Sequence, residues 1–473
     1  MGQTQTAGHF RFPQTTGRVR LFQKSVSTPM KKSGKILDPR IGYQEIFDFA
    51  SGEAPEYRLN NYLIYGRQRG NRVKSPQFPL AMSPMRSYVP DTLPLPGLDF
   101  RRLFRRAADA NAEVARFDGL LKGINNAELL LSPLTTNEAV LSSRIEGTQA
   151  TLDDVLQYEA GTKKPAVLVE DIKEIINYRQ AIYYSRRYLE SRPISLAFLR
   201  ELHQILMTGV RGTEKTPGSF RQTQNYIGKP GDTLENAIFA PPNPIRLTSD
   251  LEDFQAYLSG NDIEVLVQTA IVHVQFELIH PFNDGNGRIG RLLIPLFLYQ
   301  KNKLSQPVFY ISGYLEQHRE TYYARLREIS SPAKDWNGWI EFFLDAVTTE
   351  AVNNCEKVQN IITLYEELKE KIPQITRSQH SIRVQDAIFN RPIFQSNDFI
   401  KDVGINPSSA KRFLRQLRDA DIVRELLPKK GANPASLIFW RLINITEGRK
   451  IFSERTELEN NLSITDSTFV VHK

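Results

Sequence analysis

Apolar side chains recur three or four positions apart through most of the chain between residues 98 and 372, which is the spacing of one face of an α-helix. The pattern is clearest in 100–121, 172–189, 196–207, 265–278 and 339–347. It breaks between Pro217 and Pro242, where repeated prolines and glycines predict a β-hairpin or flap. We therefore expect a mostly α-helical protein, with an N-terminal helical region at 85–205 and a core at 206–372 that carries the flap.

The spacing changes after Pro373, where the segments become short. Three helical segments at 384–390, 397–403 and 407–417 precede two strand-like segments at 422–427 and 437–443. Three helices and a hairpin predict a winged helix-turn-helix at 376–445, followed by a polar tail at 446–473. Asn406 as a cap and Pro407 as the first helical residue favour a helix start at that point.

The first 84 residues differ from the rest in charge and in the regularity of their apolar spacing. They hold 13 Lys+Arg and 5 Asp+Glu, which accounts for the whole formal net charge of +8, and the other 389 residues hold 48 of each sign. We expect a loosely ordered basic extension, with one short element at 41–49. Met82 and Met85 precede the regular pattern, so the extension is either dispensable sequence ahead of the true start or a functional arm. Charge confined to one end does not indicate a surface built for nucleic acid.

Composition narrows the class of protein further. A length of 473 residues predicts two or three domains, and 40% hydrophobic with 24% charged residues is typical of a globular protein. Cys355 is the single cysteine, so no intramolecular disulfide forms and a reducing, cytoplasmic location is expected. The apolar run at 292–298 is far shorter than the roughly 18 residues of a membrane span, and the first 30 residues lack the apolar region of a secretory signal.

Residues 280–291, His-Pro-Phe-Asn-Asp-Gly-Asn-Gly-Arg-Ile-Gly-Arg, carry the candidate chemistry. Pro281 and the glycines forbid a continuous helix, so we expect a loop that opens onto the N-terminus of a second helix at 292–299. Free N–H groups and the helix dipole make such a start an anion site. Glycines allow a phosphate to approach the backbone, and Arg288 and Arg291 add charge and paired donors.

Two further side chains in this loop suggest a reaction. Asp284 among phosphate-binding groups suits Mg²⁺, which takes one or two carboxylates together with phosphate oxygens and water. His280 is suited to general-base catalysis near neutral pH. The combination predicts metal-assisted phosphoryl or nucleotidyl transfer to a hydroxyl. The alternative is an ordinary turn in which Asp284 caps the helix and His280 is a hydrogen-bonded loop histidine.

The loop resembles the signature of the Fic family, His-Pro-Phe-x-Asp/Glu-Gly-Asn-Gly/Lys-Arg-x-x-Arg, with every position filled. The resemblance extends over about 85–372 and implies a Fic-type helical bundle that transfers AMP from ATP to Tyr, Ser or Thr hydroxyls. It implies that His280 deprotonates the hydroxyl, that Asp284 holds Mg²⁺ and that Arg291 grips the γ-phosphate. The remaining nucleotide-binding residues that it implies are Gly285, Asn286, Gly287, Arg288, Ile289 and Gly290. The related Doc kinases lack this glycine pattern, which disfavours phosphorylation.

A second motif, Ser142-Ser-Arg-Ile-Glu146-Gly147, lies upstream of the loop. Its spacing places Ser142 and Glu146 on one face at a helix end, with Gly147 as the cap. Alone it is also typical of an ordinary helix terminus. It resembles the inhibitory motif of the Fic family, Ser/Thr-x-x-x-Glu-Gly/Asn, which implies that Glu146 pairs with Arg291 in cis and removes the donor that the γ-phosphate needs.

The resemblance also assigns the flap and an adenine site. The flap is similar to the hairpin that holds a target segment by strand addition, with Ile227, Gly228, Lys229 and Pro230 along the nucleotide and target. Tyr322 and Tyr323 are similar to a tyrosine pair that lines the adenine site. Adjacent helical residues point about 100° apart, so one of the two, Tyr323, is expected to face the pocket. A structural hairpin and core tyrosines are the alternatives.

The helix at 407–417 would be the recognition helix of the C-terminal module, and its cations are Lys411, Arg412, Arg415 and Arg418. These cations either meet DNA phosphates or form a solvated face of a protein-binding module. Three functions therefore stand: a self-inhibited protein adenylyltransferase that in some relatives also removes AMP, a winged-helix DNA-binding regulator with the Fic core as nucleotide sensor, and a kinase on the same scaffold. ATP, Mg²⁺ and a target protein are the expected partners, a homodimer is left open, and no membrane partner is expected.

Overall fold

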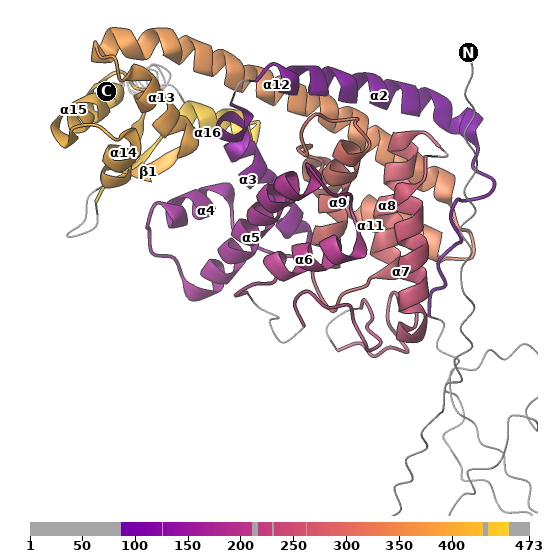
Figure 1. The fold of residues 1–473 in the computed structure, drawn as a ribbon. Helices are drawn as coiled ribbons and strands as arrows, with labels where there is room; N and C mark the ends of the chain where they lie inside the picture. Colours follow the sequence, from indigo (N-terminus) through magenta and orange to yellow (C-terminus); the bar gives the residue numbers. More distant parts are fainter. Residues whose placement is uncertain are drawn as a thin grey trace, which may run out of the picture. The chain divides into compact units, whose positions relative to one another are not determined.

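The computed structural model describes residues 87–124, 126–210, 216–228, 231–261, 263–428 and 434–453 (Figure 1). The predicted basic extension at 1–84, its element at 41–49, and most of the predicted polar tail lie outside these ranges, as do Lys229 and Pro230. None of the helices in the described ranges combines the length and apolar character that a bilayer crossing requires.

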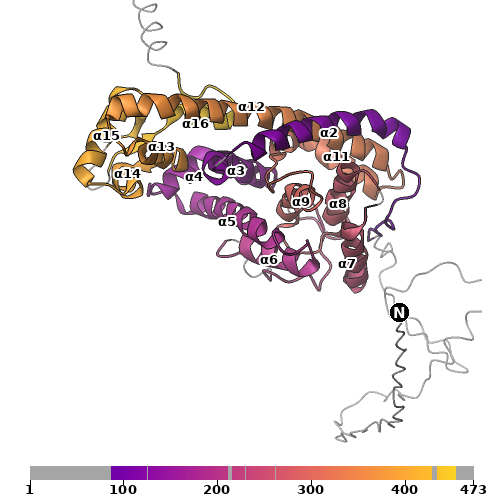
Figure 2. The ribbon, with the colours of Figure 1, turned by 45° about the horizontal axis from the view of Figure 1, so that its top comes forward.

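The N-terminal half of the described chain is helical, as the apolar spacing predicted. Its helices are α2 (Phe100–Lys122), α3 (Ala127–Ile145), α4 (Leu152–Glu159), α5 (Ala166–Leu189), α6 (Leu196–Leu206), α7 (Pro244–Ser259), α8 (Val265–Ile279) and α9 (Asn286–Gln300). They are followed by α10 (Ser312–Gln317), α11 (Arg319–Ser330) and the long α12 (Trp336–Thr376). In Figures 1 and 2, α2 runs alongside α12 in both views.

Helix α8 lies at the centre of this helical core. All of its residues except the first are buried, so the helix is enclosed by its neighbours. It packs against α7, α9 and α12. The chain leaves α8 at Ile279 and enters α9 at Asn286, so the core holds both ends of the loop between them rigidly in place.

The flap, which we define as residues 220–242, connects α6 to α7. A single antiparallel bridge closes it in the described residues, with N–H···O distances of 2.8 and 3.0 Å between Ile227 and Phe239. The regular ladder of a hairpin is therefore reduced here to one pair. Its first strand-like residue, Arg221, donates its backbone N–H to the carbonyl of Pro281 at 2.9 Å, which ties the flap to the loop after α8.

The C-terminal segments match the prediction in part. They are α13 (Ser381–Asn390), β1 (Ile393–Gln395), α14 (Ser396–Val403), α15 (Pro407–Asp419), β2 (Arg424–Leu427), β3 (Ser436–Ile438) and α16 (Trp440–Glu447). The strands form one antiparallel sheet in the order β1-β3-β2. Asn406 caps α15 by accepting from the N–H of Ser408 at 2.9 Å, and Pro407 is its first residue, as expected.

One expectation for this region was wrong, and one strand was not predicted. The segment 437–443 was expected to be a strand, but the strand ends at Ile438 and a helix begins at Trp440. A short apolar run fits either structure, and here Trp440 and Ile443 bury one face of α16. The strand β1 was not predicted at all, because three residues are too few to show an alternating pattern.

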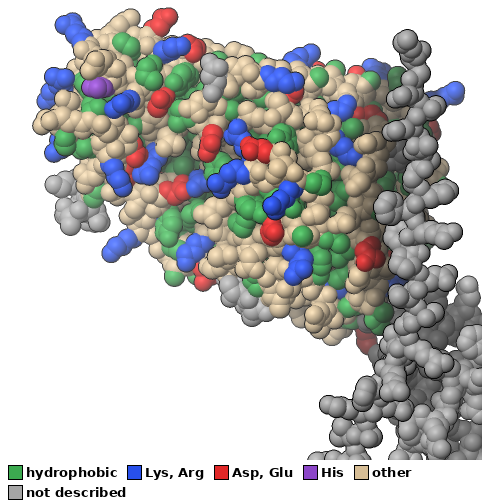
Figure 3. All heavy atoms as spheres, viewed as in Figure 1, with side chains coloured by type: hydrophobic (Ala, Val, Ile, Leu, Met, Phe, Trp, Pro, Cys, Tyr) green, Lys and Arg blue, Asp and Glu red, His purple; other side chains and the backbone are tan. Residues whose placement is uncertain are grey.

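The charged side chains of the described surface are mixed in sign. On the face shown in Figure 3, Lys and Arg are interspersed with Asp and Glu. On α15, Lys411, Arg412 and Arg415 are exposed, whereas Arg418 pairs with Glu425 at 3.0 Å. Whether α15 meets DNA or protein stays a prediction.

Candidate active site

The loop between α8 and α9 turns because two of its residues adopt left-handed backbone conformations. His280, which caps α8, has φ +50°, and Gly285, which precedes α9, has φ +72°. The second helix was expected at 292–299, but it begins six residues earlier, at Asn286. Arg288 and Arg291 therefore lie in the first two turns of α9, close to the end that carries free N–H groups and a partial positive charge.

Two side chains hold the loop in shape. The amide of Asn286 accepts from the backbone N–H of Phe282 and donates to its carbonyl, both at 2.8 Å. The ring of Phe282 is fully buried and stacks on His203 of α6 with ring centres 3.9 Å apart. The side chain of Asn286 is therefore committed to the loop, which leaves its backbone N–H as the group available to an anion.

The imidazole of His280 is held in one tautomer. Its Nδ1 lies 3.1 Å from the carbonyl oxygen of Glu277, an acceptor, so Nδ1 carries the proton and Nε2 holds a free lone pair. Burial lowers the pKa of His280 to about 4. At neutral pH the ring is therefore uncharged and ready to take a proton.

Arg221 of the flap also contacts this histidine, through its backbone carbonyl. It is 3% exposed, and its guanidinium donates to the carbonyls of His280 at 2.9 Å and Pro242 at 2.6 Å. Burial lowers the pKa of Arg221 to about 10. Sequence reasoning gave it no role, since nothing in the sequence around a buried arginine marks backbone partners that lie 21 and 59 positions away.

Ser142 and Glu146 meet Arg291 at the end of α3. The guanidinium of Arg291, 1% exposed, donates to the Ser142 hydroxyl at 2.9 Å, to the Ser142 carbonyl at 3.0 Å and to Glu146 Oε1 at 2.7 Å. Burial raises the pKa of Glu146, but the charge and hydrogen bond of Arg291 outweigh it and hold this pKa below its usual value. The carboxylate is thus ionised and paired.

Gly287 explains how Glu146 comes so close to α9. A Cβ atom at position 287 would lie 2.0 Å from Glu146 Oε1, so only glycine leaves room for the carboxylate. Gly147, with φ +102°, turns the chain away directly after Glu146. The carboxylate therefore covers the first turn of α9, where the loop geometry favours an anion.

Arg288 is engaged elsewhere. Its guanidinium pairs with Glu174 of α5 at 2.9 Å and lies 3.8 Å from Asp284 Oδ1. It is 4% exposed. Sequence reasoning placed Arg288 in an anion hole and missed Glu174, which sits among the apolar positions of α5 without a local signal.

Asp284 is the carboxylate that would hold a metal. Its Oδ1 accepts from the backbone N–H of Gly285 at 2.7 Å, and its side chain is 35% exposed. Among the described residues, no three His, Cys, Asp or Glu side chains gather as a metal cluster. One partly exposed carboxylate beside an anion site fits Mg²⁺, which takes its other ligands from phosphate and water.

The structure separates the two tyrosines. Tyr322 is 1% exposed, and its hydroxyl lies 3.0 Å from Nε2 of His273 in the core. Tyr323 is half-buried and donates its hydroxyl to the carbonyl of Ile145 at 3.3 Å, at the end of α3 beside Glu146. Only Tyr323 of the pair reaches the site, so the adenine role stays a prediction that favours this residue.

The remaining predicted residues divide between core and flap. Ile289 is fully buried, and the carbonyl of Gly290 accepts from His273. Ile227 is 42% exposed on the flap, and Gly228 follows it. Ile289 and Gly290 thus position α9, whereas Ile227 and Gly228 face solvent.

Glu277 is a further group that sequence reasoning missed. It lies one helical turn before His280, it is 8% exposed, and its Oε1 has no hydrogen-bond partner. A Cβ atom at Gly290 would lie 2.2 Å from this oxygen. Burial raises the pKa of Glu277 to about 8, so the carboxyl is largely protonated at neutral pH.

Comparison with known proteins gives a consistent result. The model of the Fic/DOC family N-terminal region matches residues 104–187, and that of the Fic/DOC family matches residues 193–298. A probable protein adenylyltransferase of Aquifex aeolicus is 28% identical over 316 residues, covering 64% of this chain and 84% of that protein.

Other relatives match a smaller share of their length. A protein adenylyltransferase of Caenorhabditis elegans is 25% identical over 240 residues, covering 48% of this chain and 45% of that protein. The chain thus spans less than half of that relative. The crystal structure of a Fic family protein from Desulfovibrio desulfuricans G20 is similar over 73% of this chain and 97% of its own, at 20% identity and a TM-score of 0.48.

Proposed function

We propose that this chain, which belongs to the Fic family, transfers the AMP moiety of ATP to Tyr, Ser or Thr hydroxyls of target proteins, its own included. The observation that carries the proposal is the tautomer of His280, whose free Nε2 stands at the start of the anion-binding loop. A module that only bound nucleotide would have no use for a neutral base there.

The reaction follows from this arrangement. Nε2 of His280 takes the proton of the target hydroxyl, the oxygen forms a bond to the α-phosphorus, and the bond to the β-phosphate oxygen breaks. Pyrophosphate leaves. The free N–H groups at the start of α9 face the charge that develops on the phosphate oxygens.

Asp284 is the residue that would hold Mg²⁺. When bound, the ion supplies positive charge to the phosphates and to the leaving group. The partial exposure of the Asp284 carboxylate leaves room for water and phosphate ligands, and this supports the assignment.

Inhibition by Glu146 is the finer part of the proposal. The carboxylate engages Arg291 at 2.7 Å and covers Gly287, so a γ-phosphate that needs either group has to displace it. With Glu146 in place, ATP binds without its α-phosphate aligned for attack. Any signal that moves α3 away from α9 would lift the restraint.

The test uses wild type, Glu146→Gly, and Glu146→Gly combined with His280→Ala. Each is incubated with Mg²⁺ and ATP labelled at the α- or the γ-phosphate, and protein-bound label is measured. We expect label from the α-phosphate alone, about tenfold or more above wild type in the single variant, and none in the double variant, which still binds ATP. Label from the γ-phosphate would indicate a kinase, and no label in any variant would contradict AMP transfer and favour AMP removal or the regulator function.

A further inference from the structure

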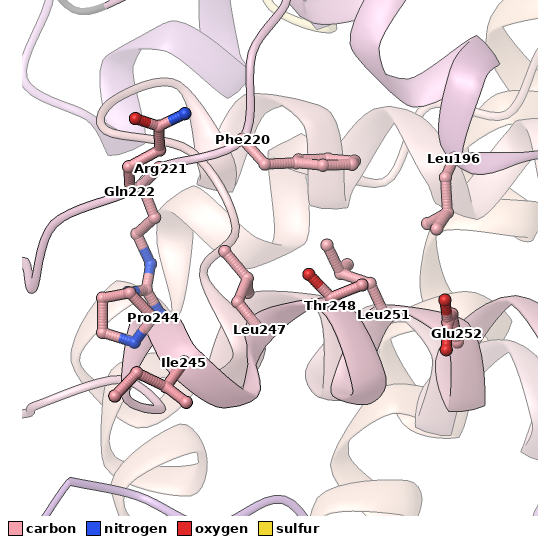
Figure 4. A pocket seen from close by; sticks show the side chains of 10 residues that line it. All are labelled: Leu196, Phe220, Arg221, Gln222, Pro244, Ile245, Leu247, Thr248, Leu251 and Glu252. Atoms are coloured by element: carbon pink, nitrogen blue, oxygen red, sulfur yellow. The ribbon is translucent and has the colours of Figure 1, made fainter. Parts of the chain in front are cut away.

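A pocket of about 450 Å³ opens between the start of the flap and α7 (Figure 4). Its apolar wall consists of Leu196, Phe220, Pro244, Ile245, Leu247 and Leu251. Ile245 is 85% exposed, so it extends the apolar wall onto the surface beside the pocket. None of Glu146, Asp284 and Arg291 lines this pocket, so it is separate from the nucleotide site.

The pocket nevertheless adjoins the catalytic base. Arg221 belongs to its wall, and the same side chain donates to the carbonyl of His280 at 2.9 Å. One arginine side chain therefore contacts both the pocket and the backbone of His280.

The flap beside the pocket offers a place for an extended chain. Within the described part of the chain, the backbone N–H groups of residues 222–226 make no hydrogen bond. A polypeptide that added to this edge would advance by about 3.3 Å per residue and would point alternate side chains to the same side.

The charge around the pocket favours one kind of bound segment. Glu252 lies at the end near Leu196, away from Arg221, and is exposed (Figure 4). The guanidinium of Arg221 is already hydrogen-bonded to backbone carbonyls. The free charge that a bound segment would meet is therefore negative.

We propose that this pocket receives a large apolar side chain of the target polypeptide, about two to four residues from the hydroxyl that accepts AMP, with a Lys or Arg next to it that faces Glu252. The inference rests on the proposed AMP transfer and adds a determinant of target choice. The base and the nucleotide select a hydroxyl, whereas this pocket selects the sequence around it.

The first test compares two bulky substitutions on α7 in the Glu146→Gly background. Thr248 and Ser249 are adjacent and exposed, and Thr248 lines the pocket whereas Ser249 does not. The probe is a set of peptides with one Tyr, Ser or Thr acceptor in a polar background and one Leu placed up to about four residues to either side.

At one of these positions we expect the Glu146→Gly variant to prefer Leu. Its kcat/KM for the peptide with Leu should be about tenfold higher than for the same peptide with Asp at that position. Thr248→Trp should abolish this preference and leave ATP affinity unchanged, and Ser249→Trp should keep it. Equal modification of all peptides by Glu146→Gly, or loss of the preference in both tryptophan variants, would overturn the proposal.

The second test reverses charge. With the best Leu position fixed, a neighbouring Lys should be favoured over Glu by about two- to fivefold. Glu252→Lys should reverse this order, while Asp253→Lys, which alters an exposed neighbour outside the pocket, should preserve it. The same order in both variants contradicts the role of Glu252.

Failure of this inference is distinguishable from failure of the proposed function. If Glu146→Gly transfers no AMP to any protein or peptide, the proposed function fails. If it transfers AMP but shows no pocket-dependent preference, the docking proposal alone fails. If Thr248→Trp reduces automodification and no peptide is selected, the occupant is a segment of this chain, and the docking of a target side chain is refuted.

Discussion

At the scale of single residues, the site is built from groups whose burial suppresses their charge. Burial lowers the pKa of His280 to about 4 and raises the pKa of Glu277 to about 8. Both are largely uncharged at neutral pH, and the ion pairs of the site include Arg291–Glu146 and Arg288–Glu174. A neutral base beside such ion pairs is suited to a reaction whose charge arrives with the nucleotide.

This electrostatic arrangement predicts a pH dependence. A base works in its unprotonated form, so the activity of Glu146→Gly should persist as pH falls below 6.5 and decline only as His280 is protonated. Removing Glu146 also removes a carboxylate that raises the pKa of His280, which moves the decline lower still. The measurement is kcat/KM for automodification or peptide transfer against pH.

The control for this profile is ATP affinity at each pH, because the nucleotide also titrates in this range. Circular dichroism confirms that the protein stays folded. A half-maximal rate near 6.5 at constant ATP affinity would show that His280 has an ordinary pKa and that its burial is lost in the active state.

At the scale of elements, the catalytic loop depends on the flap. The motif in the sequence identifies the loop, but the groups that hold it come from α6 through His203 and from the flap through Arg221. Arg221 satisfies carbonyls of the loop and of Pro242 that would otherwise be buried without a donor. The flap thus supports the loop that carries His280, in addition to the target-binding role proposed for it.

Arg221→Lys tests this support. A lysine keeps the charge but loses the forked donors, so two or three carbonyls lose their partner at about 1–3 kcal/mol each. We expect kcat in the Glu146→Gly background to fall about tenfold or more, ATP affinity to stay within about twofold, and the Tm to decrease. Arg101→Lys, at an exposed position of α2, is the control and should change neither kcat nor the Tm. Unchanged kcat with a lower Tm would show that Arg221 stabilises the fold without positioning the base.

The same scale shows what the sequence could predict. Apolar spacing located α2, α5, α6 and α8, because each of them buries a continuous face. The pairing of Glu146 with Arg291 and the tautomer of His280 are consistent with the expected roles. The sequence could not predict that Glu174 and Arg221 are partners of the site, nor that β1 forms a short strand. Tertiary contacts define these features, and no local pattern marks them.

At the scale of the whole described chain, α12 links the core to the C-terminal module. The helix runs without interruption from Trp336 to Thr376, where the module was expected to begin, and it packs against α13, α15 and α16 of that module. The module also contacts the core directly: Asn137 of α3 donates to the carbonyl of Thr446, and Arg441 pairs with Glu367 of α12 at 2.6 Å. The module therefore contacts and supports α3, the helix directly before Glu146.

These contacts predict that core and module unfold together. Trp339 is buried in the core and donates to Ala270, whereas Trp440 lies in the module and donates to the carbonyl of Asp421. In the Trp440→Phe variant the tryptophan fluorescence comes from the core. In the double variant Trp336→Phe/Trp339→Phe it comes from the module. Within each variant we expect the urea midpoint from fluorescence to coincide with the midpoint from circular dichroism, because a continuous helix transmits the loss of either part to the other. If module emission changes at a lower urea concentration than the helical signal, the module is an independent unit, and it cannot hold α3 or influence Glu146 through the folded core.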